Sequence, residues 1–252
     1  MEKIIDRKHF QGVSNIIKFN WHFYVISTVL IIVLCFLNQF LNADFLFSWI
    51  ILFIISTTII SLGVSFYIYD CTKLYDFDWI AKSDENLKIV NINAGFDETS
   101  LLFKSKFKNS NLKILDFYNP EKHTEISIER ARKSYPSQPE TVQITTSNLN
   151  LETNSVDKIF LIFAAHEIRN DQERILFFAE INRVLKPNGQ LFVMEHLRDL
   201  PNLFAYSLGF FHFLSKSNWR KTFEKSNFKI DSEQKKTIFI SIFKLSKNGK
   251  PS

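Results

Sequence analysis

The sequence has only two cysteines among its 252 residues. Cys35 lies inside a long uncharged run and Cys71 follows a second one, so the pair indicates neither a disulfide framework nor a metal-ligand spacing. This usage is consistent with a reducing, cytoplasmic setting. Internal repeats, low-complexity tracts and the spacing of a nucleophile triad are also absent from the sequence. These absences exclude disulfide-stapled and repeat architectures.

A basic and aromatic stripe is also missing, although the formal net charge is +5. Such a stripe is typical of nucleic-acid-binding surfaces. Basic residues that flank a membrane segment are instead expected beside anionic lipid. We therefore expect membrane lipid, and no nucleic acid, among the partners of this chain.

Charged residues are absent from two long stretches, residues 22–41 and 45–69. Each stretch is long enough to cross a hydrocarbon core of about 30 Å. Only three residues link them, which predicts an antiparallel transmembrane helical hairpin over residues 21–69 with both chain ends on one side. A buried soluble hairpin and a cleaved signal peptide are the alternatives, but two tandem spans without a small-residue cleavage site fit neither well.

Lysine and arginine lie outside the spans and not in their link, which predicts a multi-pass inner (cytoplasmic) membrane protein with both termini cytoplasmic. The basic residues are Lys3, Arg7, Lys8, Lys18, Lys73 and Lys82. On this interpretation residues 1–20 form a cytoplasmic N-terminal segment. Residues 70–85 form a connector, and residues 86–252 form a cytoplasmic domain.

That domain begins with a strand, turn, helix, strand pattern over residues 88–120. An apolar run at residues 88–92 predicts a buried strand, and the turn chemistry of Asn93, Ala94 and Gly95 ends it. A second strand over residues 112–115 leads to Asp116, which follows Gly95 by 21 residues. A nucleotide-binding fold places its ribose-binding acid at about this spacing. Glycine is scarce here, because Gly95 stands alone where the full fingerprint has three glycines.

The rest of the domain alternates strands and helices. Strands are predicted over residues 141–145, 157–163, 191–194 and 237–245, with helices over residues 121–133, after Asn170 and around Trp219. Asn170 with Glu173 has the spacing of a capping box. This alternation predicts an α/β fold, a doubly wound Rossmann-like sheet preceded by the transmembrane hairpin.

The order of these pieces resembles the class I S-adenosylmethionine-dependent methyltransferases over roughly residues 86–245. The most specific match is EINRVLKPNGQLFVMEH at residues 180–196, which resembles the family's helix, "RVLKPGG" turn and fifth strand. NLNLETNSVDKIFLIFAAHEI at residues 148–168 resembles the preceding loop and fourth strand. The family's first strand ends in D/E-x-G-x-G-x-G, and this chain departs from that motif with Asn91, Asn93, Gly95 and Asp97.

The resemblance implies S-adenosyl-L-methionine as cofactor and a set of residues around it. Asp116 would bind the ribose hydroxyls, Phe117 would lie against the adenine, and Thr145 or Thr146 would contact the adenine amine. Asn93, Ala94 and Gly95 would lie near the methionine moiety, and Ala164 and Ala165 would lie beneath the transferable methyl. Asn91, in the same motif, is a further candidate cofactor-binding residue.

Methyl transfer depends mainly on alignment, but a weakly acidic hydroxyl acceptor benefits from a general base. His166, after the fourth strand, is the candidate base, and the alternative is a helix-start residue bonded to backbone. Glu167 either orients His166 or begins a helix, and His196 after the fifth strand is a candidate substrate contact. The apolar segment at residues 204–213 suits a substrate lid, a second membrane-facing surface or a core segment.

A membrane anchor raises the effective concentration of a site toward membrane-dissolved molecules. We therefore expect methyl transfer to a lipophilic acceptor, phenolic, quinone-like or lipid. The missing glycines keep a second hypothesis open, a non-catalytic methyltransferase-fold scaffold or assembly factor. A nicotinamide-dependent reductase fits less well, because the turn at residues 186–189 suits the methyltransferase pattern better.

Overall fold

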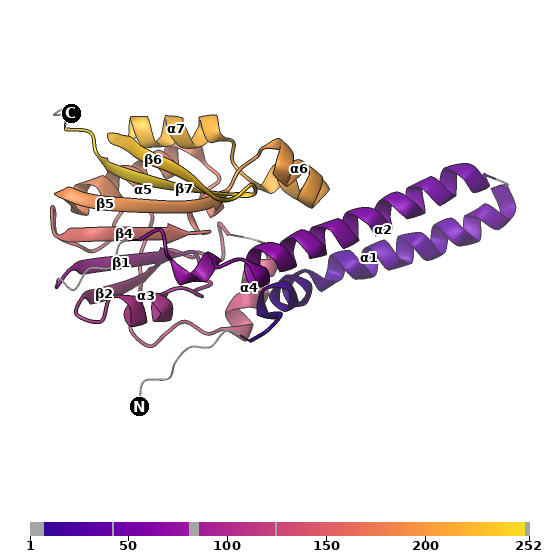
Figure 1. Ribbon diagram of the computed structural model, residues 1–252, viewed down its shortest axis with the longest axis horizontal. Helices are drawn as coiled ribbons and strands as arrows, with labels where there is room; N and C mark the ends of the chain where they lie inside the picture. The colour runs from indigo at the N-terminus through magenta and orange to yellow at the C-terminus, as the bar shows by residue number, and fades with distance from the viewer. Residues whose placement is uncertain (1–7, 42, 81–85, 124, 250–252) are drawn as a thin grey trace.

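The computed structural model describes residues 8–41, 43–80, 86–123 and 125–249. Two long helices project from an α/β domain as an antiparallel hairpin (Figure 1). They are α1 (Gln11–Leu41) and α2 (Asp44–Phe66), and the chain continues through the π-helical turn η1 (Tyr67–Cys71) and the 3-10 turn η2 (Leu74–Asp76). Lys3, Arg7 and Lys82 of the orientation argument, and residues 81–85 of the expected connector, lie outside the described residues.

Both hairpin helices are long and apolar enough to cross a membrane by length and composition. Their most apolar windows bury 6% and 0% of their residues against the rest of the protein, so the hairpin is not a buried core element. α1 bends at Asn20, whose φ of −114° and ψ of 18° are not helical. Gly12, Asn15 and Phe19 before the bend are buried, and Arg130 of the domain still contacts Trp21 and His22 directly after it.

The domain is built on a seven-stranded sheet in the order β3-β2-β1-β4-β5-β7-β6. The strands are parallel except that β7 runs antiparallel to both β5 and β6. Their bounds are β1 Lys88–Asn93, β2 Asn111–Asp116, β3 Thr141–Gln143, β4 Val156–Ile162, β5 Leu185–His196, β6 Phe228–Thr237 and β7 Ile240–Lys247. The helical elements are α3 Ser100–Lys106, α4 Ile126–Ser134, η3 Ala165–Glu167, α5 Asp171–Val184, α6 Leu200–Tyr206, η4 Ser207–His212 and α7 Lys216–Lys225. The expected mixed α/β sheet is confirmed.

Three local predictions need correction. The turn expected at residues 187–189 lies inside β5, where the register jumps from Leu185 opposite Val156 to Gln190 opposite Lys158. The strand expected at residues 237–245 is present as β7, but it begins at Ile240, and it pairs with β6, which was not predicted and which ends at Thr237. α4 begins at Ile126 rather than at residue 121, because the preceding residues form a separate turn.

The two faces of the sheet bury different parts of the chain. Side chains alternate across a strand, so Leu191 and Val193 of β5 join one core while Phe192 joins another. The first core includes α5 and α7. The second includes Phe103 of α3 together with Phe77 of the connector, each with 1% or less of its surface exposed. The connector is therefore a layer of the domain.

The foot of the hairpin is hydrogen-bonded into the domain. The Asp70 carboxylate accepts from the backbone N–H groups of Gly12 at 2.7 Å and Val13 at 2.8 Å, and it thereby caps the start of α1. The Tyr135 hydroxyl donates to Asn15 Oδ1 at 2.8 Å from the end of α4. Arg130 of α4 donates to the Phe19 carbonyl at 2.7 Å. These bonds fix where the hairpin leaves the domain.

Candidate functional site

The loop after β1 is shaped by two side chains that depart from the family motif, Asn91 at the acidic position and Asp97 at the last glycine position. Asp97 Oδ1 accepts from the backbone N–H groups of Thr99 at 3.0 Å and Ser100 at 2.9 Å, so it caps the start of α3. Asn91, which is 1% exposed, donates to Ser100 Oγ at 2.7 Å. Gly95 has a φ of +96°, a conformation that L side chains rarely adopt, which explains why a glycine remains at this position.

Asp116 lies where the ribose-binding acid was expected, at the end of β2 and opposite Asn93 in the register. It is completely buried, and both of its carboxylate oxygens have donors. Oδ2 accepts from Arg132 Nη1 at 2.6 Å, and Oδ1 accepts from the Tyr118 backbone N–H at 2.8 Å. Arg132 therefore neutralises the carboxylate from α4.

Arg132 and Tyr118 also cover Gly95. The Arg132 guanidinium carbon lies 4.4 Å from the centroid of the Tyr118 ring. A Cβ atom added to Gly95 would lie 2.9 Å from Arg132 Nη1 and 3.0 Å from Tyr118 Cδ2. No sequence motif predicts that Arg132 and Tyr118 cover Gly95, because this contact depends on the path of the loop between β2 and α4.

The other residues expected at the cofactor are less closely grouped. Phe117 is 2% exposed, and its ring centroid lies 5.2 Å from that of Phe177 in the core, so it has little surface to offer an adenine. Thr146 donates to Glu173 at 2.7 Å, while Thr145 is exposed beside Ser147. Ala94 and Ala164 are buried at the ends of β1 and β4. The structure thus groups the β1 loop with Asp116 and leaves Thr145 on the surface.

His166 lies in η3, directly after β4, between two carboxylates. Its Nδ1 is 2.7 Å from Glu195 Oε2, and its Nε2 is 3.0 Å from Glu167 Oε1. Burial lowers the pKa of His166, but the charges of Glu195 and Glu167 outweigh burial and raise it to about 10. The imidazole therefore carries a proton at neutral pH in this arrangement, and it would have to lose that proton before acting as a base.

Glu167 contacts the His166 ring, but it ends the helical turn η3 and does not begin a helix, since α5 starts at Asp171. Burial raises its pKa, but the His166 charge outweighs burial and holds the pKa of Glu167 well below its usual range. Asn170 caps α5 as expected, accepting from the Glu173 N–H at 2.9 Å. The Glu173 carboxylate bonds to Lys122 and Thr146.

His212 is a further member of this group that the sequence analysis did not single out. It ends η4, and its ring centroid is 4.9 Å from that of His166. Its Nδ1 is 2.7 Å from Glu125 Oε1, and its Nε2 is 3.6 Å from Glu167 Oε1. Only the path of the chain through α6 and η4 brings it to the end of β4.

His196 has a different environment. It is 5% exposed, its Nδ1 lies 3.0 Å from Asn202 Oδ1, and its Nε2 lies 2.8 Å from the Tyr69 hydroxyl. Burial lowers the pKa of His196 to about 4, so the neutral ring donates through Nδ1 and accepts through Nε2. His196 thereby joins β5 to α6 and to the hairpin foot, and it leaves little surface for a substrate.

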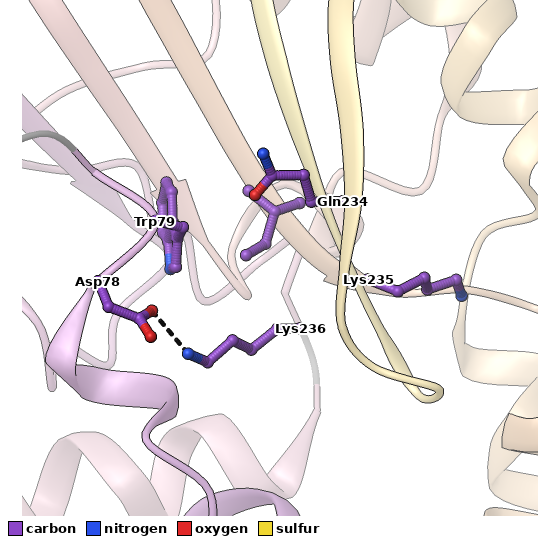
Figure 2. A pocket seen from close by; sticks show the side chains of 6 residues that line it. Asp78, Trp79, Gln234, Lys235 and Lys236 are labelled. Atoms are coloured by element: carbon purple, nitrogen blue, oxygen red, sulfur yellow. Dashed lines mark hydrogen bonds and ion pairs between the residues drawn. The ribbon is translucent and has the colours of Figure 1, made fainter.

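A cavity of about 300 Å³ lies elsewhere, between the connector and β6 (Figure 2). Two of the residues that line it, Asp78 and Lys236, form an ion pair of 2.6 Å. Its lining residues are Asp78, Trp79, Gln234, Lys235, Lys236 and Ile242. None of these is an expected site residue.

Residues 122–193 match a family of proteins described as a methyltransferase domain. The chain is similar to a solved structure of a SAM-dependent methyltransferase from Methanosarcina mazei, at 17% identity over 66% of this chain and 94% of that one, with a TM-score of 0.49. It is also similar to a SAM-dependent methyltransferase from Aquifex aeolicus, at 14% identity over 65% of this chain and 84% of that one, with a TM-score of 0.45. No curated protein matches the chain.

The domain match and the mixed seven-stranded sheet support a class I S-adenosylmethionine-dependent methyltransferase. S-adenosylmethionine is the cofactor that this assignment carries. The β1 loop fits such a group, because Asn93 Nδ2 and Asp97 Oδ2 are buried without a hydrogen-bond partner among the described residues. Asn93, Gly95 and Asp116 would hold the cofactor, which supplies the methyl group. Arg132 occupies an Asp116 oxygen that a ribose hydroxyl would take, so its side chain has to move.

Proposed function

We propose that this protein transfers a methyl group from S-adenosylmethionine to a lipophilic, membrane-associated acceptor of phenolic, quinone-like or lipid type. In this proposal α1 and α2 cross the inner membrane, and the domain and both termini are cytoplasmic. The observation that carries the proposal is an apolar surface beside the hairpin foot.

This membrane-facing surface consists of exposed apolar side chains on α6 and η4. Its members are Leu200, Leu203, Phe204, Leu208 and Phe211, with exposed fractions from 36% to 80%. α6 contacts α2, so the surface adjoins the exposed apolar hairpin (Figure 1). Large exposed apolar patches mark interaction sites, and this one continues the surface of a candidate membrane span.

The surface also leads to the group around His166. η4 carries Leu208 and Phe211 and ends at His212, whose ring lies against His166 at the end of β4. Ligands of open α/β sheets bind at this carboxyl edge of the strands. A lipophilic acceptor that enters along α6 and η4 would therefore arrive at the edge where the β1 loop and Asp116 also lie. In this proposal His166 and Glu167 contact the acceptor.

The experiment compares acceptors and surfaces with full-length protein in lipid nanodiscs. Replacing Phe204 and Leu208 together by serine should reduce methyl transfer to a bilayer-dissolved phenol while sparing a water-soluble analogue. Leu176→Ser is the matched control, because Leu176 is 62% exposed on α5, outside the membrane-facing surface. Equal losses on both acceptors would contradict the role of this surface in acceptor entry.

A second function is favoured by one observation, the ion pair that occupies Asp116. A non-catalytic scaffold of the methyltransferase fold has no need of a free ribose-binding acid. Calorimetric titration with S-adenosylhomocysteine separates the two functions. The enzyme binds this product with a measurable heat, whereas a scaffold that has lost the site does not.

A further inference from the structure

The structure brings two histidines and a glutamate together as a set of metal ligands. Their ligating atoms, from His166, Glu167 and His212, all lie within 4.8 Å of one another. We propose that this His-Glu-His cluster binds a divalent transition-metal ion such as Zn²⁺. His212 follows His166 by 46 residues, so no short sequence motif signals the site.

The two distances from Glu167 suit a tetrahedral ion. Glu167 Oε1 lies 3.0 Å from His166 Nε2 and 3.6 Å from His212 Nε2. Ligands held at about 2.0–2.1 Å from a tetrahedral zinc are roughly 3.3 Å apart, a spacing that these two distances bracket. The two imidazole rings are inclined at 74°, and both Nε2 atoms approach the same carboxylate oxygen.

Each histidine also has an outer carboxylate. Glu195 Oε2 lies 2.7 Å from Nδ1 of His166, and Glu125 Oε1 lies 2.7 Å from Nδ1 of His212. A carboxylate that accepts the Nδ1 proton leaves Nε2 with its lone pair available, which is the common arrangement around protein-bound metals. Both histidines present the same nitrogen toward Glu167. These two outer carboxylates distinguish the cluster from a chance contact between charged side chains, because they orient both rings as in a metal site.

The charges of the group favour a divalent cation. Glu125, Glu167 and Glu195 bring three negative charges, and Arg169 brings one positive charge. When a cation displaces Arg169 and the proton of His166, three negative charges face the two positive charges of a divalent ion. Glu195 and Glu167 are only 1% and 8% exposed as side chains, so solvent does little to relieve their charge.

Arg169 is the group that has to move. Its guanidinium contacts His212 Nδ1, lies 3.1 Å from His212 Nε2 and lies 3.2 Å from Glu125. The Arg169 side chain is 43% exposed, so it can turn into solvent when a cation binds. Three protein ligands leave one position of a tetrahedral ion open for water or another oxygen ligand. The bound ion would also tie η4 of the membrane-facing surface to η3 at the end of β4.

The experiment measures metal binding directly, and it needs no assumption about methyl transfer. Full-length protein carrying a tag without histidines is purified in detergent, stripped with a chelator and titrated calorimetrically with ZnCl₂. Wild type should bind one Zn²⁺ per chain. Glu195→Gln should weaken binding by roughly 10–100-fold, the range expected for an outer carboxylate. Glu167→Gln, which removes the negative charge of a ligand, and His212→Phe, which removes a ligand atom, should weaken it further.

His9→Gln and Arg169→Ala complete the design. His9 is exposed at the start of α1, so its removal should leave Zn²⁺ binding unchanged. Arg169→Ala removes the displaced cation and should bind Zn²⁺ at least as tightly as wild type. A thermal melt without metal checks that each variant is folded, and Zn²⁺ should raise the midpoint of wild type but not of His212→Phe. The proposal is overturned if folded His212→Phe binds Zn²⁺ as tightly as wild type or if wild type binds none.

Discussion

Replacing Arg132 by alanine should change cofactor binding and domain stability in opposite directions. In the folded domain, Arg132 Nη1 donates at 2.6 Å to an Asp116 carboxylate that is fully buried. In the proposed cofactor site a ribose hydroxyl replaces this bond, so Arg132 has to turn away from Asp116. When only a fraction of the protein has the conformation that binds the ligand, the apparent dissociation constant is the intrinsic one divided by that fraction. Arg132→Ala removes this requirement.

The magnitude follows from the type of bond. A hydrogen bond to a charged group contributes about 1.5–3 kcal/mol. The Arg132 side chain is 30% exposed, so solvent screening places its contribution at the lower end, about 1–2 kcal/mol. Because about 1.4 kcal/mol corresponds to a factor of ten, S-adenosylhomocysteine should bind roughly tenfold more tightly to Arg132→Ala. The ligand-free domain should lose about 3–5 kcal/mol of unfolding free energy, because the buried Asp116 carboxylate is left without its charged partner.

Calorimetric titration gives the affinity, and urea unfolding in detergent gives the stability. Arg130→Ala is the matched control, because Arg130 lies on the same helix and carries the same charge but donates to the Phe19 carbonyl instead of Asp116. It should leave the affinity unchanged. If Arg132→Ala binds S-adenosylhomocysteine no more tightly than Arg130→Ala, Arg132 does not compete with the ribose and the reasoning fails.

Three further predictions follow from other parts of the structure. Burial lowers the pKa of His196 in the folded protein from 6.5 to about 4. As the pH falls, the unfolded chain therefore binds a proton at this histidine before the folded chain does. Wild type should therefore lose up to about 3 kcal/mol of unfolding free energy between pH 6.5 and 4 relative to His196→Asn, and parallel pH profiles would refute this. Phe178→Ala, at a fully buried ring between β-sheet and α7, should cost about 3–5 kcal/mol by urea unfolding. Reporters fused before residue 1 and after residue 252 should both behave as cytoplasmic, and periplasmic activity at either end would contradict the hairpin topology.

The sequence alone determined the features that depend on local composition and period. Two uncharged runs of membrane-spanning length predict the hairpin helices, and the structure has α1 and α2 there. Apolar runs predict β1, β2 and β4, because a strand buried on both faces needs apolar side chains throughout. The cap at Asn170 was predictable because it needs only the Asn170 side chain and the backbone N–H three residues later. The spacing from Gly95 correctly places Asp116 beside the end of β1.

The partners of the site residues were decided by the tertiary structure. Arg132 meets Asp116, and His212 meets His166, only because loops and helices of irregular path return the chain to the same edge of the sheet. Hydrophobic period shows which face of an element is buried, but it does not show which distant side chain lies opposite. The same limit applies to the segment at residues 204–213, whose apolar composition suited a core, a lid or a membrane surface equally. Its exposure followed from packing, since α5, α7 and the connector already cover the two faces of the sheet.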